Sequence, residues 1–269
     1  MDPLIAWLGG EDVAMRYLVA GALVAARVMP LLLFSPWLVT RAAPTLLRTA
    51  IALVLTVSFT PMALAHAILI PAGALFGLAL LREVVVGLIY SIAVALPFFA
   101  FDWAGRLVDT WRGAGLAEVL APTTGERTSP LGNMLLMFSV AVFLAIGGHR
   151  LAISTFAEGF TTQPLGGILH AHETREATFM ALRIIVDALA FAVALAAPAA
   201  VAILAVEMGL GLVARTTPQV PVFFAGMPLR AAVGLVAVLF SLSLLMGEMP
   251  HAFRLAILGA KDLMMKLGN

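Results

Sequence analysis

Long apolar runs that carry almost no charge dominate this sequence, and they limit the folds that the chain can adopt. The run Thr49–Leu81 contains no Asp, Glu, Lys or Arg, and neither do Ala188–Val206 and Ala231–Gly247. About 20 apolar residues of helix are enough to cross the hydrocarbon core of a bilayer. Hydrophobic residues make up 62% of the chain and charged residues 12%, whereas soluble domains carry about 25% charged residues. The sequence therefore predicts an integral membrane protein.

The apolar runs predict an all-α, polytopic membrane fold of about six to eight apolar helices, with no sheet. Further runs of spanning length are Val84–Phe101 and Ser129–Gly148. Proline inside a helix removes a hydrogen bond and kinks or ends the helix. We therefore expect short, partly broken or re-entrant helices in the regions Tyr17–Val39 and Thr49–Leu81, which contain Pro30, Pro36, Pro61 and Pro71.

Several functional classes have no support in the residue content. The formal net charge of +1 leaves no basic surface for nucleic acid. The absence of cysteine excludes disulfides, thiolate catalysis and cysteine-ligated metals. The motifs G-x-S-x-G and H-E-x-x-H are absent, and His170 and His172 would point away from each other on a helix. We expect neither an enzyme nor a bound cofactor or metal.

Charged residues inside or against the apolar runs need partners. An unpaired charge at the centre of a bilayer costs about 2.5–3.5 kcal/mol on insertion scales. Arg183 and Asp187 are four residues apart on one helix face and can pair with each other. We interpret the other charges, which have no evident partner nearby in the sequence, as charges that neighbouring polypeptides complete. They are Arg16, Arg27, Arg48, Arg82 and Glu83.

A stripe of alternating charge follows the apolar run that ends at Phe101. Its members step by four, three and three residues, as the neighbours on one helix face do: Asp102, Arg106, Asp109 and Arg112. The stripe is either a solvated helix face or the lining of a polar channel or partner surface, and the two interpretations weigh equally. The next stretch, GAGLAEVLAPTTGERTSPLG, contains Gly and Pro residues that oppose regular structure. Irregular backbone beside membrane helices has to be buried in protein or line a watery cavity.

The stretch EMGLGLVARTTPQVPVFFAGMPLR, Glu207 to Arg230, separates two of the most apolar runs. Glu207 and Arg215 are eight residues apart, about 12 Å along a helix, and cannot pair while that helix is intact. Pro218 and Pro221 then end the helix, which predicts a helical hairpin. The tip of this hairpin is equally well an ordinary polar loop at the membrane surface or a contact for other polypeptides.

The same stretch resembles the FliR/SctT family (also SpaR and HrcT), which are components of the type III protein-export gate. It contains, in the family's order, an acid, a glycine, Arg-x-x-Pro-Gln, a phenylalanine and a Met-Pro-Leu-basic ending. Val220 and Pro221 follow Pro-Gln here, where the family often has an asparagine. Three further blocks resemble the family along nearly the whole chain: ARVMPLLLFSPWLVTRAAPTLLRTAIALVL, LREVVVGLIYSIAVALPFFAFDWAGRLVDTWRGAGLAEVLAP and FLAIGGHRLAISTFAEGF.

The resemblance implies that the chain is a single copy in a hetero-oligomer with several FliP/SctR-like and FliQ/SctS-like hydrophobic subunits. Such an assembly forms the portal through which unfolded protein substrates leave the cytoplasm, in the bacterial inner membrane at the base of a secretion apparatus. FlhA/SctV-like and FlhB/SctU-like export components would be further partners. Residues 1–185 would form a FliP/SctR-like helical part, and residues 186–269 a FliQ/SctS-like helical hairpin with the C-terminal tail.

The resemblance also assigns roles to residues. A loop near 113–128 would plug the closed pore, and two phenylalanines would lie near the constriction, although aromatic residues in an apolar run more often pack in a core. The residues expected in the plug and its surroundings are Gly113, Ala114, Gly115, Leu116, Phe98 and Phe99. Those expected in subunit contacts and at the hairpin tip are Arg27, Arg48, Glu83, Asp109, Glu207, Arg215, Pro218 and Gln219.

Two other functions stay open. A small secondary transporter would use broken helices and intramembrane charges for its substrate site, but the chain is short, has few deep acids and shows no inverted repeat. An unrelated membrane scaffold is the third possibility. Within the family, the contexts DTWRG and TSPLG and the glycine pair before His149 favour an injectisome over a flagellum.

Overall fold

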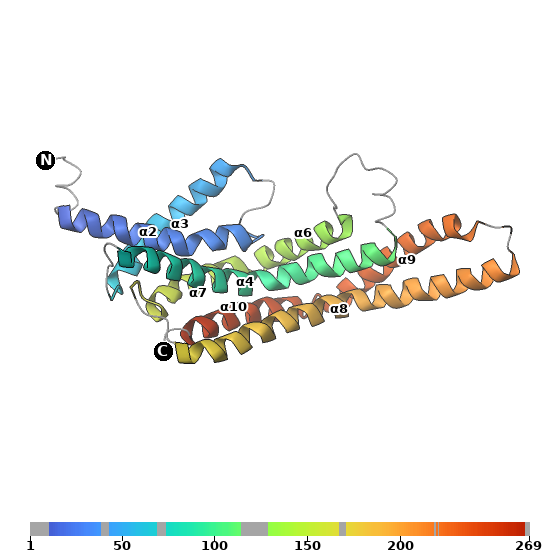
Figure 1. Ribbon diagram of the computed structural model, residues 1–269. Coiled ribbons are helices and arrows are strands. Elements are labelled where there is room, and N and C mark those ends of the chain that lie inside the picture. The colour runs from blue at the N-terminus through green and yellow to red at the C-terminus, as the bar shows by residue number, and fades with distance from the viewer. Residues whose placement is uncertain are drawn as a thin grey trace. The chain divides into compact units, whose positions relative to one another are not determined.

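The structure, a computed structural model, describes residues 11–38, 43–68, 74–113, 129–166, 171–217, 219 and 221–266. In these residues the chain forms eight helices and no strand (Figure 1). Five helices are long and apolar enough to cross a membrane, and a sixth span results if α6 (Pro130–Ala145) and α7 (Gly148–Thr162) count as one broken span. The prediction of an all-α, polytopic membrane fold is confirmed.

The chain forms two compact units, and three helices contribute residues to both. The first unit comprises Met1–Leu96, Gly147–Ile184 and Phe253–Asn269. Its helices are α2 (Glu11–Phe34), α3 (Thr45–Ala65), α7, the first parts of α4 (Ala74–Trp111) and α8 (Ala171–Thr216), and most of α10 (Met249–Lys266).

A close helix crossing and an aromatic cluster hold the first unit together. Gly87 of α4 lies against α2, where a Cβ atom would be 2.1 Å from the carbonyl oxygen of Arg27. The Tyr90 hydroxyl donates a hydrogen bond to a carbonyl oxygen of α7 at 2.6 Å. Phe59 of α3 and Tyr90 of α4 both contact Phe156 of α7, with ring centroids 5.6 and 5.2 Å apart. Helices α2, α3, α4 and α7 therefore share one core.

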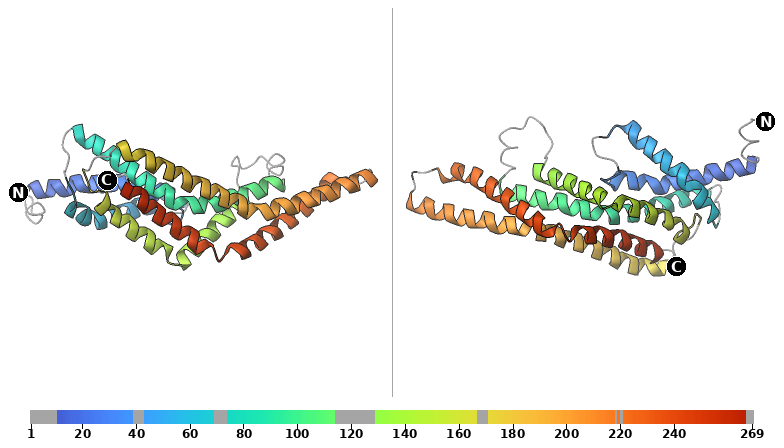
Figure 2. Two further views of the ribbon diagram at one scale, coloured as in Figure 1. Left: turned by 90° about the horizontal axis from the view of Figure 1, so that it is seen from below. Right: turned by 180° about the vertical axis from the view of Figure 1, so that it is seen from behind.

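The second unit comprises Pro97–Ile146 and Ile185–Ala252. It contains the last part of α4, α6, most of α8, and α9 (Val222–Leu245). Helices α4 and α6 approach closely, since a Cβ atom on Gly105 would lie 2.5 Å from the Cα of Gly132. Helices α8 and α9 form a hairpin (Figure 2), and its arms approach closely where a Cβ atom on Gly234 of α9 would lie 3.1 Å from Ile203 of α8.

The prolines of the first half have different effects. The run Thr49–Leu81 is split as predicted, because α3 ends at Ala65 and α4 begins at Ala74. Pro30 and Pro61 lie inside α2 and α3 and do not end them, whereas Pro71 lies outside the described residues. Helices α4 and α8 contain 38 and 46 residues and continue well past their apolar runs. At 1.5 Å per residue they are about 57 and 69 Å long.

Candidate functional site

Three buried charges meet in the core of the first unit. The Nε atom of Arg27 donates to Oε2 of Glu83 at 2.5 Å, and Nη1 of Arg82 donates to Oε1 of the same carboxylate at 2.7 Å. All three side chains are buried. One carboxylate therefore neutralises one of two guanidinium groups and forms hydrogen bonds to both.

The end of α7 supplies the remaining acceptors. Arg27 donates to the carbonyl oxygens of Gly159 and Gln163 at 3.2 and 2.8 Å, and Arg82 donates to the Gln163 side chain at 2.6 Å. The last carbonyl groups of a helix have no partner within the helix, and its C-terminus attracts cations. The Gln163 side chain also donates to the carbonyl oxygen of Met264 in α10 at 2.9 Å. The cluster thus joins α2, α4, α7 and α10.

Arg27 and Glu83 were expected to contact other subunits, and that role stays a prediction. In the structure both side chains are enclosed by this chain, and each has its charge partner within it. Residues 27 and 83 are 56 positions apart, so no local pattern in the sequence indicates the pair. The only indication in the sequence was that Arg27 is a single basic residue in one apolar run and that Glu83 is a single acidic residue at the start of another.

The charged stripe on α4 anchors the beginning of α6. Arg106 donates to Asp102 at 2.9 Å, and Arg112 donates to Asp109 at 2.8 Å. The other oxygen of Asp109 accepts from the Ser129 hydroxyl at 2.5 Å and from the backbone N–H of Leu131 at 3.0 Å. Both carboxylates are buried, whereas the Arg106 side chain is 40% exposed, so the stripe is only partly the solvated face that was one of its two interpretations. Asp109 instead satisfies a free N–H at the N-terminus of α6.

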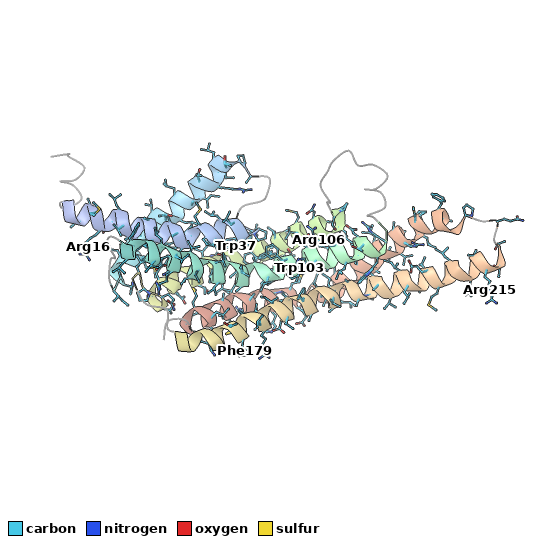
Figure 3. All side chains as sticks on the ribbon, in the orientation of Figure 1. Arg16, Trp37, Trp103, Arg106, Phe179 and Arg215 are labelled. Carbon is cyan, nitrogen blue, oxygen red and sulfur yellow. The ribbon has the colours of Figure 1, made fainter. Side chains whose placement is uncertain are left out.

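The structure describes only part of the predicted plug. Gly113 is the last described residue after α4 and has a φ of +79°, which favours glycine. Ala114, Gly115 and Leu116 lie outside the described residues. Phe98 is buried against Phe143, with ring centroids 5.0 Å apart. Phe99 stacks on Trp103 of the same helix at 6.2 Å (Trp103 and Arg106 are labelled in Figure 3). Proximity of the two phenylalanines to a pore stays a prediction.

The predicted hairpin is present between α8 and α9. Helix α8 ends at Thr216, and α9 begins at Val222 after Pro221. Arg215 and Gln219 are exposed at the tip, and Arg215 forms no hydrogen bond or ion pair with other described residues (Figure 3). Pro218 lies outside the described part, and Arg48 is half-buried on α3.

Glu207 pairs across the hairpin instead of along its own helix. Its Oε1 lies 3.7 Å from Nη1 of Arg230 in α9. Glycines flank Arg230 one turn to either side: a Cβ atom on Gly226 would lie 2.7 Å from Leu210, and one on Gly234 would lie 3.1 Å from Ile203. The two arms of the hairpin therefore cross closely on both sides of the ion pair. The eight-residue spacing excluded Arg215 as the partner of Glu207, but no pattern in the sequence indicated Arg230.

Comparison with known proteins decides the family. Residues 18–256 match the sequence profile described as "Bacterial export proteins, family 1". The chain belongs to this family. It is 29% identical over 178 residues to "Yop proteins translocation protein T" of Yersinia pestis, covering 66% of each chain. It is 30% identical over 150 residues to "Surface presentation of antigens protein SpaR" of Shigella sonnei, covering 56% of this chain and 57% of that protein.

A flagellar relative also matches this bacterial export protein. "Flagellar biosynthetic protein FliR" of Escherichia coli (strain K12) is 26% identical over 211 residues, which cover 78% of each chain. The alignments with the two secretion relatives span less than two thirds of those proteins' own lengths. The resemblance to the FliR/SctT family is confirmed. Because both secretion and flagellar relatives match, the preference for an injectisome stays a prediction.

Proposed function

We propose that this chain is one subunit of a membrane-embedded export gate, through which unfolded proteins leave the cytoplasm of a bacterium. A single copy would combine with several FliP/SctR-like and FliQ/SctS-like subunits in the inner membrane, at the base of a secretion apparatus. Membership of the bacterial export family and the printed names of its relatives support this proposal. FlhA/SctV-like and FlhB/SctU-like components would adjoin the gate and supply substrates and energy.

An exposed apolar face on α8 carries the proposal of an assembly. Large apolar side chains on one side of the helix are exposed along most of its length, and we call them the α8 stripe. The α8 stripe consists of Phe179, Leu182, Val186, Leu189, Val193, Val201, Leu204, Met208 and Leu212 (Figure 3 labels Phe179). Their spacing of three, four and eight residues keeps them on one helix face.

The α8 stripe is longer than the membrane is thick. From Phe179 to Leu212 it extends about 50 Å at 1.5 Å per residue. The hydrocarbon core is about 30 Å thick. Transmembrane helices tilt by about 40° at most, and at that tilt the stripe would still need about 38 Å. The hydrocarbon core alone therefore cannot cover the stripe, and we assign the rest of it to protein from another polypeptide.

Other helices leave similar faces open. In the apolar windows of α8 and α9 only 28% and 22% of the residues are buried, and in α3 only 17%, against 61% in α4. A chain that is surrounded only by lipid can leave such faces open, but an apolar face longer than the hydrocarbon core is thick favours a protein partner. We assign these faces to contacts with the small hydrophobic subunits.

In the proposed assembly, the two parts of the chain take the places that the family resemblance predicts for them. Residues 1–185 would occupy a FliP/SctR-like place and residues 186–269 a FliQ/SctS-like place, with the exposed hairpin tip in a subunit contact. Gly113–Leu116 would plug the closed pore. A secondary transporter is less well supported, because Arg27 and Glu83 are buried and pair with each other rather than facing an open site for a solute.

Photo-crosslinking along the α8 stripe tests the proposal. A photoreactive residue replaces Leu182 in one variant and Leu212 in another, about 45 Å apart on the helix. We expect both positions to give adducts with a FliP/SctR-like or FliQ/SctS-like protein, identified by mass spectrometry. Adducts with lipid alone at both positions would contradict the proposal.

A further inference from the structure

We infer that Glu207 binds a positively charged side chain of a neighbouring membrane polypeptide, and that Arg230 is the positioning residue that holds its carboxylate. The inference rests on the proposed function, because it requires the chain to be a subunit of a hetero-oligomer. It specifies one partner contact. The partner segment is a helix that covers the α8 stripe and carries a Lys or Arg at the level of Glu207.

The pair between Glu207 and Arg230 is incomplete within this chain. Its atoms are 3.7 Å apart, which is beyond the 3.2 Å limit of an ordinary N–H to oxygen hydrogen bond. Every other ion pair in the described residues is at 2.9 Å or shorter. Glu207 accepts no hydrogen bond from the described residues, and Nε of Arg230 is buried without a partner among them. The Glu207 carboxylate can therefore accept hydrogen bonds from a group outside this chain.

The outward side of this pair is negative. The Glu207 side chain is 46% exposed and the Arg230 side chain only 18%. Two members of the α8 stripe, Leu204 and Met208, are exposed beside Glu207. A partner that covers this apolar surface also covers the carboxylate and removes it from water. A carboxylate in such surroundings is stable when a cation or strong donor pairs with it. Charge complementarity therefore favours Lys or Arg on the covering helix.

The packing of the hairpin positions the guanidinium group of Arg230 beside the carboxylate. Gly226 and Gly234 allow α9 to approach α8 on either side of Arg230, and a Cβ atom on Gly226 would lie 3.3 Å from Nη2 of Arg230. The guanidinium group is thus confined between the two helices and faces Glu207 from the inner side. The partner's cation would approach from the outer side, so the carboxylate would lie between two positive groups.

Two variants distinguish a Glu207 that contacts a partner subunit from a Glu207 that only pairs with Arg230 in its own chain. Glu207→Gln removes the charge with almost no change in shape. The double variant Glu207→Arg with Arg230→Glu reverses the pair but keeps it. The fraction of the chain found in the hetero-oligomer is measured by native mass spectrometry of the protein extracted from its host. We expect Glu207→Gln to lower this fraction about tenfold or more, as the loss of one member of a desolvated charge pair does.

The reversed pair should not restore assembly, because the partner's cation would then face a cation. Restoration to the wild-type fraction would overturn the inference, and so would unchanged assembly of Glu207→Gln. Glu158→Gln is the matched control, since Glu158 is 50% exposed but already satisfied by Lys261 at 2.7 Å. It should assemble normally. If the wild-type chain itself has no partners, the proposed function fails and not only this inference.

A second measurement does not depend on the stability of the variants. A photoreactive residue in place of Met208 leaves Glu207 and Arg230 intact. We expect its adduct to lie within one helical turn of a Lys or Arg in an apolar segment of the partner. An adduct with an uncharged helix, or with lipid only, would overturn the inference.

Discussion

At the scale of single residues, the chain places charges in its core and pairs carboxylates with guanidinium groups there. Glu83 accepts hydrogen bonds from guanidinium groups on both of its oxygens. At the end of α7, Arg27 donates to two carbonyl oxygens, and Arg82 donates to the Gln163 side chain. Arg27 also lies over the ring of Phe160, with 4.4 Å between the guanidinium carbon and the ring centroid. Removing one charged side chain from such a cluster destabilises the fold, because the remaining charges stay buried without a partner.

Glu83→Gln tests this dependence. The variant leaves two buried guanidinium groups without a carboxylate, and such a break costs about 3–5 kcal/mol of the free energy of unfolding. Thermal unfolding of the purified chain in detergent should therefore occur at a clearly lower temperature. Glu158→Gln, which breaks the half-exposed pair with Lys261, should cost at most about 1 kcal/mol. Equal melting temperatures for the two variants would contradict the role of the cluster.

The sequence indicated that Arg27, Arg82 and Glu83 need partners but not how they pair. Arg27 and Glu83 each lie within or against an apolar run, which was enough to predict that they need partners. Their partners were assigned to other polypeptides, because a sequence shows pairs only when the members are a few residues apart. The link between Glu207 and Arg230 was missed for the same reason, since it depends on a hairpin that brings positions 207 and 230 together.

At the scale of helices, glycines decide which helices approach each other closely. Two glycines of α4, Gly87 and Gly77, differ in how closely another helix approaches them. A Cβ atom on Gly87 would lie 2.1 Å from the carbonyl oxygen of Arg27, whereas one on Gly77 would meet nothing within 4 Å. The backbone of α2 cannot give way as the end of a side chain can. The crossing of α2 and α4 therefore requires glycine at position 87 but not at position 77.

Gly87→Ala should separate α2 from α4 and weaken the Arg27–Glu83 contact, with a marked fall in melting temperature. Gly77→Ala should leave the melting temperature unchanged or raise it, because alanine favours helix by about 1 kcal/mol over glycine at an exposed position. Both variants are measured in the same detergent by thermal unfolding. A Gly87→Ala chain as stable as the Gly77→Ala chain would contradict the close crossing.

The capping of α6 makes a second prediction at this scale. Ser129→Ala removes the hydroxyl that accepts from the N–H of Gly132 and donates to Asp109, and loss of such a cap costs about 1 kcal/mol. Hydrogen exchange should become faster in the first turn of α6 and stay unchanged in α7. Ser154→Ala is the control, since Ser154 is exposed and bonds only to its own helix. Unchanged exchange at the start of α6 would show that the cap is not needed there.

The positions of helices were more predictable than their lengths. Proline and glycine clusters placed the hairpin between α8 and α9 and the break before α4 correctly. The extent of α8 was not predicted, because the apolar run Ala188–Val206 covers less than half of the helix. Polar residues outside that run continue the helix without interruption, and Pro198 lies inside it without ending it.

At the scale of the whole molecule, several helices carry apolar surfaces that the chain does not cover itself. The α8 stripe exceeds the thickness of the hydrocarbon core, and α3 and α9 expose most of their apolar windows. None of this was predictable in detail, since a sequence shows that a helix is apolar but not which of its sides neighbouring helices bury. Family resemblance, which the sequence did show, supplied the expectation that other subunits cover them.

Deletion of Gly113–Leu116 tests the plug at this scale. If these residues close the resting pore, the deletion should leave the hetero-oligomer intact and let ions or small solutes pass the membrane. Leakage is measured as dissipation of an ion gradient in cells that carry the variant, with the wild-type gate as the control. A gate that assembles and stays tight after the deletion would remove the plug assignment.

The most direct test of the central claim is the composition of the particle that contains this chain. Native mass spectrometry of the tagged protein, gently extracted from its own host, measures that composition. The account predicts one copy of this chain with several copies of two small hydrophobic proteins, whose sequences would also separate a flagellum from an injectisome. A stable monomer or homodimer without partners would contradict the export-gate account.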